Sequence, residues 1–270
     1  MSNVNATELF RLDGKVALVT GGARDLGFDM AVALAQFGAD VIVTSRTLAK
    51  AEKSAAEIRD LSDSDTLGLE LDHCDWAQVQ RVAEQANEWK GRLDILVNNA
   101  GGGSGDAPGN LLERPVEEID YLLRNNLLGP IQCCKAFGAY MVRQGSGKII
   151  NIASIAAVLG RDRSVYERSA MNGQPIEYAA AKAGIIGMTR DLAGLFSPLG
   201  ILVNAISPGG FDKGLLPETF VKDYGDATML GHMGRMGLDM KGVVVFLASS
   251  ASDYITGANV VVDGGFSIKK

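Results

Sequence analysis

Short apolar runs rich in β-branched residues alternate with helical stretches from one end of this 270-residue chain to the other. Strands that are separated by helical crossovers lie parallel in one sheet, with helices on both faces. The apolar runs are continuous, as expected for strands buried on both sides. Strands are predicted at 16–20, 40–44, 66–71, 95–97, 148–152, 202–205 and 259–262. Helices are predicted at 25–37, 48–60, 76–89, 115–142, 177–196 and 239–249. The pattern predicts an α/β fold with a doubly wound parallel sheet of about seven strands.

The composition fits one globular domain and excludes several functional classes. Hydrophobic residues make up 47% of the chain, enough for a sizeable core, and no break in composition divides residues 1–270. The net charge of −6 argues against a nucleic-acid or anionic-membrane surface. No apolar run approaches the roughly 20 residues that span a bilayer. Residues 1–13 lack the pattern of a signal peptide, so a cytoplasmic location is expected.

Cysteine and histidine are too few and too scattered for metal or hydrolase chemistry. The three cysteines, Cys74, Cys133 and Cys134, have no metal-site spacing and are expected to be buried thiols. The two histidines, His73 and His232, lie far apart in the sequence. We therefore predict no metal site and no serine-hydrolase triad.

A glycine-rich turn, Thr20 to Gly27, joins the first predicted strand to the first predicted helix. At such a turn, backbone N–H groups and the helix N-terminus can face a pyrophosphate. Glycines also serve turns that bind nothing, but the position after the first strand of a βαβ unit favours a dinucleotide site. The chain is therefore predicted to be a single-domain Rossmann fold.

The end of the second strand bears on the choice of coenzyme. NAD-specific Rossmann sites place an acid about 20 residues after the glycine turn to hold the adenosine ribose. Here Ser45 and Arg46 stand at that place, and neither is acidic. Arg46 is suited to pair with a 2′-phosphate, with Arg24 as a second cation, unless it merely lies in solvent at a helix start. NADP(H) is favoured, with NAD(H) as the alternative.

Tyr178 and Lys182 are four residues apart on a predicted helix and therefore share one of its faces. A free tyrosine has a pKa of about 10, and a neighbouring cation lowers it, which suits the phenol to general acid–base work. The pair alone is equally compatible with a helix surface. Tyr166 is excluded as a competitor because Ala170, not a lysine, follows four residues later.

Several of these elements, taken in order, resemble the short-chain dehydrogenase/reductase family from about residue 12 to residue 266. The resemblance rests on the glycine turn, on Asn98-Asn99-Ala100-Gly101 after the fourth strand, and on the tyrosine–lysine pair. It implies that Tyr178 exchanges a proton with the substrate oxygen and that Lys182 lowers its pKa and binds the nicotinamide ribose. It further implies that Ser154 polarises the carbonyl and that Asn126 positions a water linking Lys182 to solvent.

The same resemblance implies a set of coenzyme-binding positions: Gly21, Arg24, Asp25, Leu26, Gly27, Ser45, Arg46, Asp72, His73, Asn99, Ala100, Gly101, Tyr178, Lys182, Pro208, Gly209 and Phe211. The sequence departs from the family pattern in the glycine turn and again after the Pro-Gly turn. Asp25 replaces the middle glycine of the turn, and we interpret it as a helix N-cap whose charge Arg24 offsets. Asp212 and Lys213 stand where a threonine is usual after the Pro-Gly turn.

Two segments are expected to lie beside the substrate. Residues 155–177 separate Ser154 from Tyr178 by more than is usual in the family and form an arginine-rich insertion. Its arginines, Arg161, Arg163 and Arg168, either meet an anionic or hydroxyl-rich substrate or belong to a solvated loop used in subunit packing. Residues 211–238 are rich in glycine and are interpreted as a mobile lid, lined by Met229, Met233 and Met236 unless these are core residues.

The resemblance implies an NAD(P)-dependent oxidoreductase that transfers a hydride between nicotinamide and a carbonyl or secondary alcohol. A polar sugar- or polyol-type substrate is favoured. The alternatives are a 3-oxoacyl thioester reductase acting on acyl carrier protein and a catalytically silent NAD(P)-sensing binding protein. Asp263-Gly264-Gly265 resembles a subunit-contact feature, so a homo-oligomer, a tetramer or a dimer, is expected by analogy.

Overall fold

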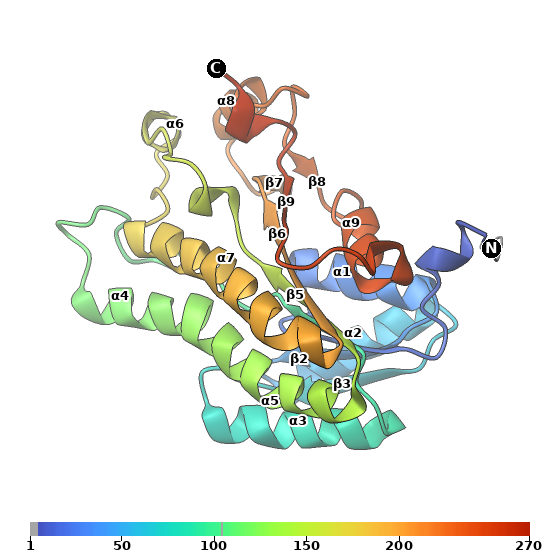
Figure 1. Cartoon of the computed structure of the whole chain (residues 1–270). Coiled ribbons are helices and arrows are strands. Elements are labelled where there is room, and N and C mark those ends of the chain that lie inside the picture. The colour runs from blue at the N-terminus through green and yellow to red at the C-terminus, as the bar shows by residue number, and fades with distance from the viewer. Residues whose placement is uncertain (1–4, 104) are drawn as a thin grey trace.

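The computed structural model describes residues 5–103 and 105–270, and its centre is a seven-stranded parallel sheet (Figure 1). The spatial order of the strands is β3-β2-β1-β4-β5-β6-β9. Their bounds are β1 Val16–Val19, β2 Asp40–Ser45, β3 Thr66–Glu70, β4 Ile95–Asn98, β5 Gly147–Ile152, β6 Ile201–Pro208 and β9 Asn259–Val262. The predicted sheet is confirmed. The predicted domain of 1–270 also takes in residues 1–4 and 104, which lie outside the described residues.

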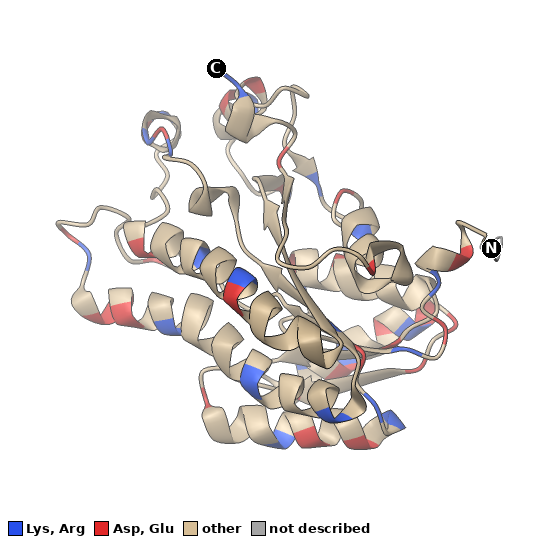
Figure 2. Ribbon diagram, viewed as in Figure 1, with Lys and Arg blue, Asp and Glu red and all other residues tan. Residues whose placement is uncertain are grey.

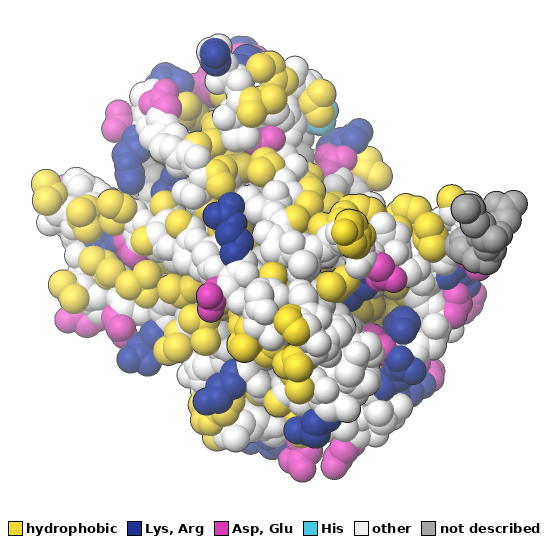
Figure 3. All heavy atoms as spheres, viewed as in Figure 1, with side chains coloured by type: hydrophobic (Ala, Val, Ile, Leu, Met, Phe, Trp, Pro, Cys, Tyr) yellow, Lys and Arg dark blue, Asp and Glu magenta, His cyan; other side chains and the backbone are white. Residues whose placement is uncertain are grey.

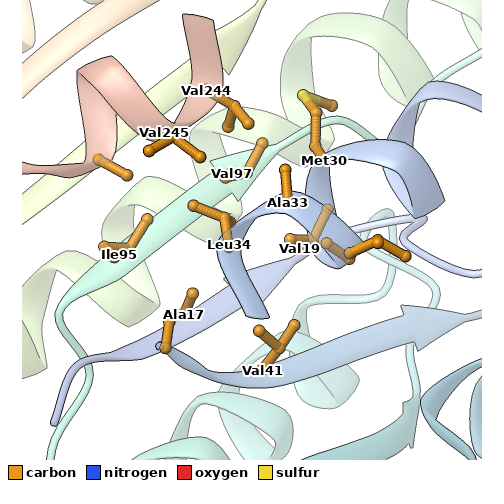
Figure 4. Packing of buried hydrophobic residues seen from close by; sticks show 14 of the residues in the cluster. Ala17, Val19, Met30, Ala33, Leu34, Val41, Ile95, Val97, Val244 and Val245 are labelled. Carbon is orange, nitrogen blue, oxygen red and sulfur yellow. The ribbon is translucent and has the colours of Figure 1, made fainter. Parts of the chain in front are cut away.

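Helices cover both faces of the sheet. The principal helices are α1 Asp25–Gln36, α2 Leu48–Asp60, α3 Trp76–Lys90, α4 Val116–Leu123, α5 Gly129–Gln144, α7 Ile176–Phe196 and α9 Lys241–Ala248. Alternate residues of β1 point to opposite faces of the sheet. Ala17 and Val19 pack with α1 and α9 on one face, whereas Val16 and Leu18 pack with α3 and α5 on the other. Figure 4 shows the first layer, where Leu34 of α1 and Val245 of α9 meet the strands.

The strand order reverses between β1 and β4, which are neighbours in the sheet although β2 and β3 lie between them in sequence. In open parallel sheets, a crevice opens at such a reversal, outside the carboxyl ends of the strands. The glycine-rich turn follows β1, and the Asn99–Gly101 stretch follows β4. The fold therefore brings these two motifs to one place.

The helix predicted at 115–142 differs from the structure. It begins at Val116, ends at Gln144 and contains a π-helical turn, Arg124–Leu128, between α4 and α5. Pro130 lies in the first turn of α5 and has no N–H to donate to the carbonyl four residues earlier, that of Asn126. In the π-helical turn before it, the Gly129 N–H bonds to the Arg124 carbonyl five residues earlier, and such turns often mark functional sites.

Several short elements that were not predicted lie in the segments 155–177 and 211–238, which we together call the cap. These elements are α6 Ser164–Arg168, β7 Phe211–Asp212, α8 Glu218–Asp226 and β8 Gly234–Arg235. Figure 1 shows α6 and α8 standing above the carboxyl edge of the sheet. The Tyr166 and Phe220 rings lie 5.2 Å apart between their centroids, and Arg168 pairs with Asp223 at 2.8 Å. The insertion therefore packs on the 211–238 segment.

Charged residues are distributed over many of the helices and loops that cover the sheet (Figure 2). Over residues 5–103 and 105–270, no helix is both long and apolar enough to cross a membrane. In the same described part of the chain, no three His, Cys, Asp or Glu side chains gather where they could hold a metal ion.

Candidate functional site

The glycine turn after β1 is tied directly to the motif after β4. The Thr20 hydroxyl accepts hydrogen bonds from the backbone N–H groups of Asn99 and Ala100, both at 3.0 Å. The Asn99 amide donates to the carbonyls of Thr20 and Gly21. A Cβ on Gly27 would lie 2.4 Å from both Asn99 Nδ2 and the Gly21 oxygen, so no larger residue fits there. This close approach of helix and turn is what a dinucleotide-binding turn requires.

Asp25 does not act as the N-cap that the sequence suggested. The N-cap is Arg24, and Asp25 adopts a left-handed backbone conformation with φ of 51°, which favours glycine. Its carboxylate pairs with Lys213 Nζ at 2.7 Å, while Arg24 Nε lies 3.9 Å away. The N-cap interpretation is therefore wrong, and the nearest cation comes from the segment 211–238.

At the end of β2, Arg46 is exposed, and no acidic side chain among residues 5–103 and 105–270 pairs with it. An acid does lie nearby on the adjacent strand, because Glu70 of β3 is in register with Ser45. Its carboxylate accepts a hydrogen bond from the Leu48 N–H at the start of α2. The region thus offers one exposed cation beside a carboxylate that is held by a helix N-terminus.

Asp72 and His73 follow β3 but have different surroundings. Asp72 accepts a hydrogen bond from the Cys74 N–H in the turn before α3. His73 is buried, its Nε2 lies 2.9 Å from Asn125 Oδ1, and burial lowers its pKa. The His73 ring therefore supports the π-helical turn.

Asn126 is fully buried in that π-helical turn and holds the loop after β4. Its Nδ2 donates to the carbonyls of Gly102 and Leu122, and its Oδ1 accepts from the Gly102 N–H. A Cβ on Gly101 would lie 2.7 Å from Asn126 Oδ1 and 3.7 Å from Lys182 Nζ. Asn126 and Lys182 therefore meet at Gly101.

Lys182 lies one turn after Tyr178 on α7. Its Nζ donates to the Ile152 carbonyl at 2.9 Å and sits 5.7 Å from the centroid of the Tyr178 ring. The side chain is buried, and burial lowers the pKa of Lys182 to about 8. Ser154, just after β5, accepts from the Ala156 N–H. All four residues expected to be catalytic are thus brought to the carboxyl edge of the central strands.

The pKa of Tyr178 is raised above that of free tyrosine, because burial of the phenol outweighs the opposing effects. The hydrogen bond with Ser154 and the charge of Arg161 both lower it. The expected net lowering by Lys182 is therefore not found: the ammonium lies over the ring and is directed to a carbonyl. A phenol with a raised pKa is protonated at neutral pH and can donate a proton.

The Pro208-Gly209 turn ends β6 and leads into the cap. The Gly209 N–H donates to the Val262 carbonyl, and the Gly210 N–H donates to the Tyr224 hydroxyl at 2.6 Å. Phe211 is buried in the main core, so only its backbone is available to a ligand. The turn is held from two sides, by β9 and by α8.

The three insertion arginines make contacts within the protein. Arg161 Nη2 donates to the carbonyls of Gln174 and Pro175, and Arg163 also reaches the Gln174 carbonyl. Arg168 pairs with Asp223 of α8. These contacts within the chain fix the shape of the insertion. Of the three methionines considered, Met233 is buried, Met236 is partly buried in the main core, and Met229 is exposed.

Sequence reasoning missed three charged contacts. They are the Asp25–Lys213 pair, the Glu70 contact with α2, and a buried ion pair between Arg114 and Glu177, the residue before Tyr178. The first had a visible signal: both positions depart from the family pattern, with opposite charges. The other two join residues whose separation in sequence carries no periodic signal.

Comparison with known proteins agrees with this geometry. A family model described as enoyl-(acyl carrier protein) reductase matches residues 21–267. Cyclohexanol dehydrogenase of Rhodococcus sp. (strain TK6) is 36% identical, covering 97% of this chain and 99% of that protein. D-threitol dehydrogenase of Mycolicibacterium smegmatis is 36% identical, over 96% of this chain and 95% of that protein. The 3-oxoacyl-(acyl-carrier-protein) reductase FabG of Escherichia coli is 36% identical, over 94% and 97%.

A solved structure shows the same fold. Gluconate 5-dehydrogenase of Burkholderia cenocepacia J2315, in complex with NADP and tartrate, superposes with a TM-score of 0.87 at 32% identity. The match covers 97% of this chain and 99% of that one. The similarity therefore extends over the sheet, the helices and the cap alike.

Proposed function

The chain belongs to the short-chain dehydrogenase/reductase family, and on that premise we propose that it transfers a hydride between NADP(H) and a polyol- or sugar-type substrate. Similarity to cyclohexanol and D-threitol dehydrogenases supports an oxidoreductase that acts on alcohol or polyol substrates. The observation that carries it is the meeting of Ser154, Tyr178, Lys182 and Asn126 at the carboxyl edge of the sheet. It weighs against a silent binding protein, which would need only the nucleotide turn.

The residues of the glycine turn fit a dinucleotide, because Gly27 leaves room for backbone approach and the α1 N-terminus favours phosphate. The nicotinamide, when bound, supplies or accepts the hydride. Ser154 holds the substrate oxygen, and Tyr178 donates a proton to it in reduction or removes one in oxidation. Lys182 binds the nicotinamide ribose, and Asn126 anchors the Gly102 loop next to Lys182.

The preference for NADP(H) is supported by Arg46 and by a relative with that coenzyme. Arg46 is exposed at the end of β2, where a 2′-phosphate would approach, and β2 itself contributes no acid after Asp40. Glu70 is the competing feature, although its carboxylate is occupied by the Leu48 N–H. The gluconate 5-dehydrogenase structure was solved with NADP.

The substrate class is supported by relatives named for polyol substrates, D-threitol dehydrogenase of Mycolicibacterium smegmatis and the NADP-dependent mannitol dehydrogenase of Hypocrea jecorina. The second candidate, reduction of a 3-oxoacyl thioester on acyl carrier protein, is favoured by the FabG relative and by the description of the family model.

The test of this proposal combines binding and turnover. Titration with NADPH and NADH at matched salt is expected to show tighter binding of NADPH. The R46Q variant should bind NADPH about tenfold more weakly and NADH as the parent does. Equal or tighter binding of NADH would overturn the coenzyme assignment. Turnover of threitol, mannitol or gluconate, set against cyclohexanol and an acetoacetyl thioester, decides the substrate class. Activity confined to the thioester would replace the polyol assignment.

A homo-oligomer, a tetramer or a dimer, is the remaining part of the proposal. Large apolar side chains are exposed on and before α4, among them Leu112, Val116 and Tyr121, and Figure 3 shows apolar side chains gathered on that side of the molecule. Contiguous exposed apolar surface of this kind is typical of protein interfaces. Light scattering of the purified protein tests this part, and a monomer at micromolar concentration would overturn it.

A further inference from the structure

Two departures from the family pattern meet in space. Asp25 occupies a glycine position in the phosphate turn, and Lys213 belongs to the Asp212-Lys213 pair that follows Phe211, where a threonine is usual. Their charged atoms, Asp25 Oδ2 and Lys213 Nζ, are 2.7 Å apart. The two opposite charges therefore pair at the N-terminus of α1.

We propose that Asp25 and Lys213 form a charge clasp that sets coenzyme affinity and couples it to the position of the segment 211–238. Lys213 is the cation that cancels the Asp25 carboxylate next to the diphosphate. It is a positioning residue, because it acts through Asp25. Binding of the coenzyme therefore depends on Lys213 remaining at the N-terminus of α1, and so on where this part of the cap lies.

The location of Lys213 is reinforced by a second tie. Asp29 Oδ2 accepts a hydrogen bond from the Gly237 N–H at 2.6 Å. Asp25 and Asp29 are four residues apart on α1 and share one face of it. The two acids therefore hold positions near both ends of the segment 211–238. Because the Asp29 contact already holds the segment 211–238 against α1, Lys213 loses little additional freedom when it pairs with Asp25.

The other available cation is a poorer partner for Asp25. Arg24 Nε lies 3.9 Å from the carboxylate, and 77% of its side chain is exposed. The Lys213 and Asp25 side chains are 47% and 35% exposed, so their attraction is partly screened. An exposed pair of this kind adds little to folding stability. We expect the pair to affect coenzyme affinity instead, because without Lys213 the diphosphate would meet an unpaired Asp25 carboxylate.

The experiment is a double-mutant cycle read as the dissociation constant of NADPH, by fluorescence at low salt. K213M is expected to raise that constant about tenfold, because one unscreened carboxylate then faces the diphosphate. D25N should change it by less than about twofold, because the carboxylate that Lys213 neutralises is then absent. D25N/K213M should match D25N within about twofold instead of showing the tenfold effect of K213M, which is the mark of a coupled pair. At about 1 M salt, where screening is complete within a few ångströms, the differences should disappear.

Matched variants separate the clasp from general effects of charge and of folding. K222M removes a lysine from α8 whose partner is Asp226, and D29N removes a charge one turn further along α1 while keeping a hydrogen-bond acceptor. In both variants, the dissociation constant of NADPH should stay within about twofold of the parental value. Melting temperatures of all variants without coenzyme should agree within a few degrees.

Additive effects of K213M and D25N would overturn the clasp, as would an equal effect of K222M. A variant that fails to fold is replaced by the conservative K213R, which keeps the charge and should keep the parental constant. Altered affinity in K213R equal to that of K213M would likewise overturn the proposal. The cycle compares variants with one nucleotide, so it holds whichever coenzyme the enzyme prefers and whatever its substrate is.

Discussion

The coenzyme half of the molecule, from β1 to β4, and the cap are built on different principles. In the coenzyme half, short turns join buried strands, and the contacts of Thr20 and Asn99 are imposed by the strand order itself. In the cap, short helices are held by side-chain contacts, such as Tyr166 with Phe220 and Arg168 with Asp223. In the first region, these contacts join side chains to the backbone of neighbouring turns, whereas in the second they join side chains of different segments.

This difference teaches where function can change without loss of the fold. At Gly27 and Gly68 of the coenzyme half, an added Cβ would lie 2.4 Å from backbone atoms of a neighbouring element, which leaves no room for adjustment. Substitutions in the cap remove single contacts between segments that carry few other constraints. We therefore expect variants in the first region to abolish binding or turnover, and variants in the second to cause smaller shifts in binding constants, substrate constants or pH profiles.

The largest expected effect belongs to Tyr178, which lies where the two regions meet. Y178F removes the proton donor and should lower kcat by about 10³-fold, within the range typical of general acid–base groups. Binding of NADPH should change little, because the ring remains. The matched control is Y166F, whose ring packs on Phe220 in the cap and which should keep most of the activity. Retained turnover in Y178F would refute the assignment.

The second effect tests the coenzyme half alone. G27A adds a Cβ that would lie 2.4 Å from Asn99 Nδ2 and from the Gly21 oxygen, so turn and helix must separate. NADPH binding should weaken about 100-fold, because the turn no longer presents its amides together. Isothermal titration measures the loss.

The matched control for G27A is G187A, on the exposed side of α7, where an added Cβ meets no atom within 4 Å. A glycine inside a helix is replaced there by a better helix former, so the melting temperature should rise by the equivalent of about 0.5–1 kcal/mol. Equal NADPH affinity in G27A and the parent would break the comparison between the two regions.

Much of the coenzyme half was predictable because its signals are local. Apolar runs located every strand of the sheet, and the positions of Gly21 and Gly27 located the turn. The conformation of Asp25 was missed, since its partner Lys213 is remote in sequence and the N-cap preference of aspartate pointed elsewhere. The π-helical turn at Asn126 was missed because helical periodicity hardly changes over five residues.

For the cap, the sequence predicted where the two segments lie but not the helices and strands that they form. Its helices α6 and α8 are short, and their burial depends on each other, as with Tyr166 and Phe220. A segment whose apolar residues pack against another irregular segment shows no period that a sequence can reveal. The carbonyl and carboxylate partners of the insertion arginines were likewise not visible in the sequence.

The pH dependence sharpens the comparison, because a cap residue acts on the pKa of Tyr178. Burial raises that pKa, so the phenol is protonated near neutrality. Alcohol oxidation needs the deprotonated form, and its rate should rise about tenfold per pH unit below the pKa. Carbonyl reduction needs the protonated form and should stay level until the pH passes the pKa. Rate profiles in both directions measure this.

Two variants locate the source of the Tyr178 pKa. S154A removes a hydrogen bond that lowers it, and R161M removes a nearby charge that lowers it, so both should move the oxidation profile to higher pH. R168M is the matched control, because that arginine is engaged by Asp223 and should leave the profile in place. An unchanged profile in R161M would show that the cap has no electrostatic influence on the reaction.

The smallest effect tests whether the cap acts as one unit. Arg168 of α6 and Asp223 of α8 form a half-exposed ion pair at 2.8 Å, and exposed pairs contribute only about 0.2–1 kcal/mol. R168Q and D223N should each raise the substrate KM about threefold, with kcat unchanged, a size that follows from that energy.

If the insertion and the segment 211–238 move together, the double variant should resemble either single one, because each change already breaks the same contact. If the two segments close over the substrate independently, the effects should multiply. K53Q, which breaks only the exposed pair with Glu57 inside α2, is the control and should leave KM unchanged.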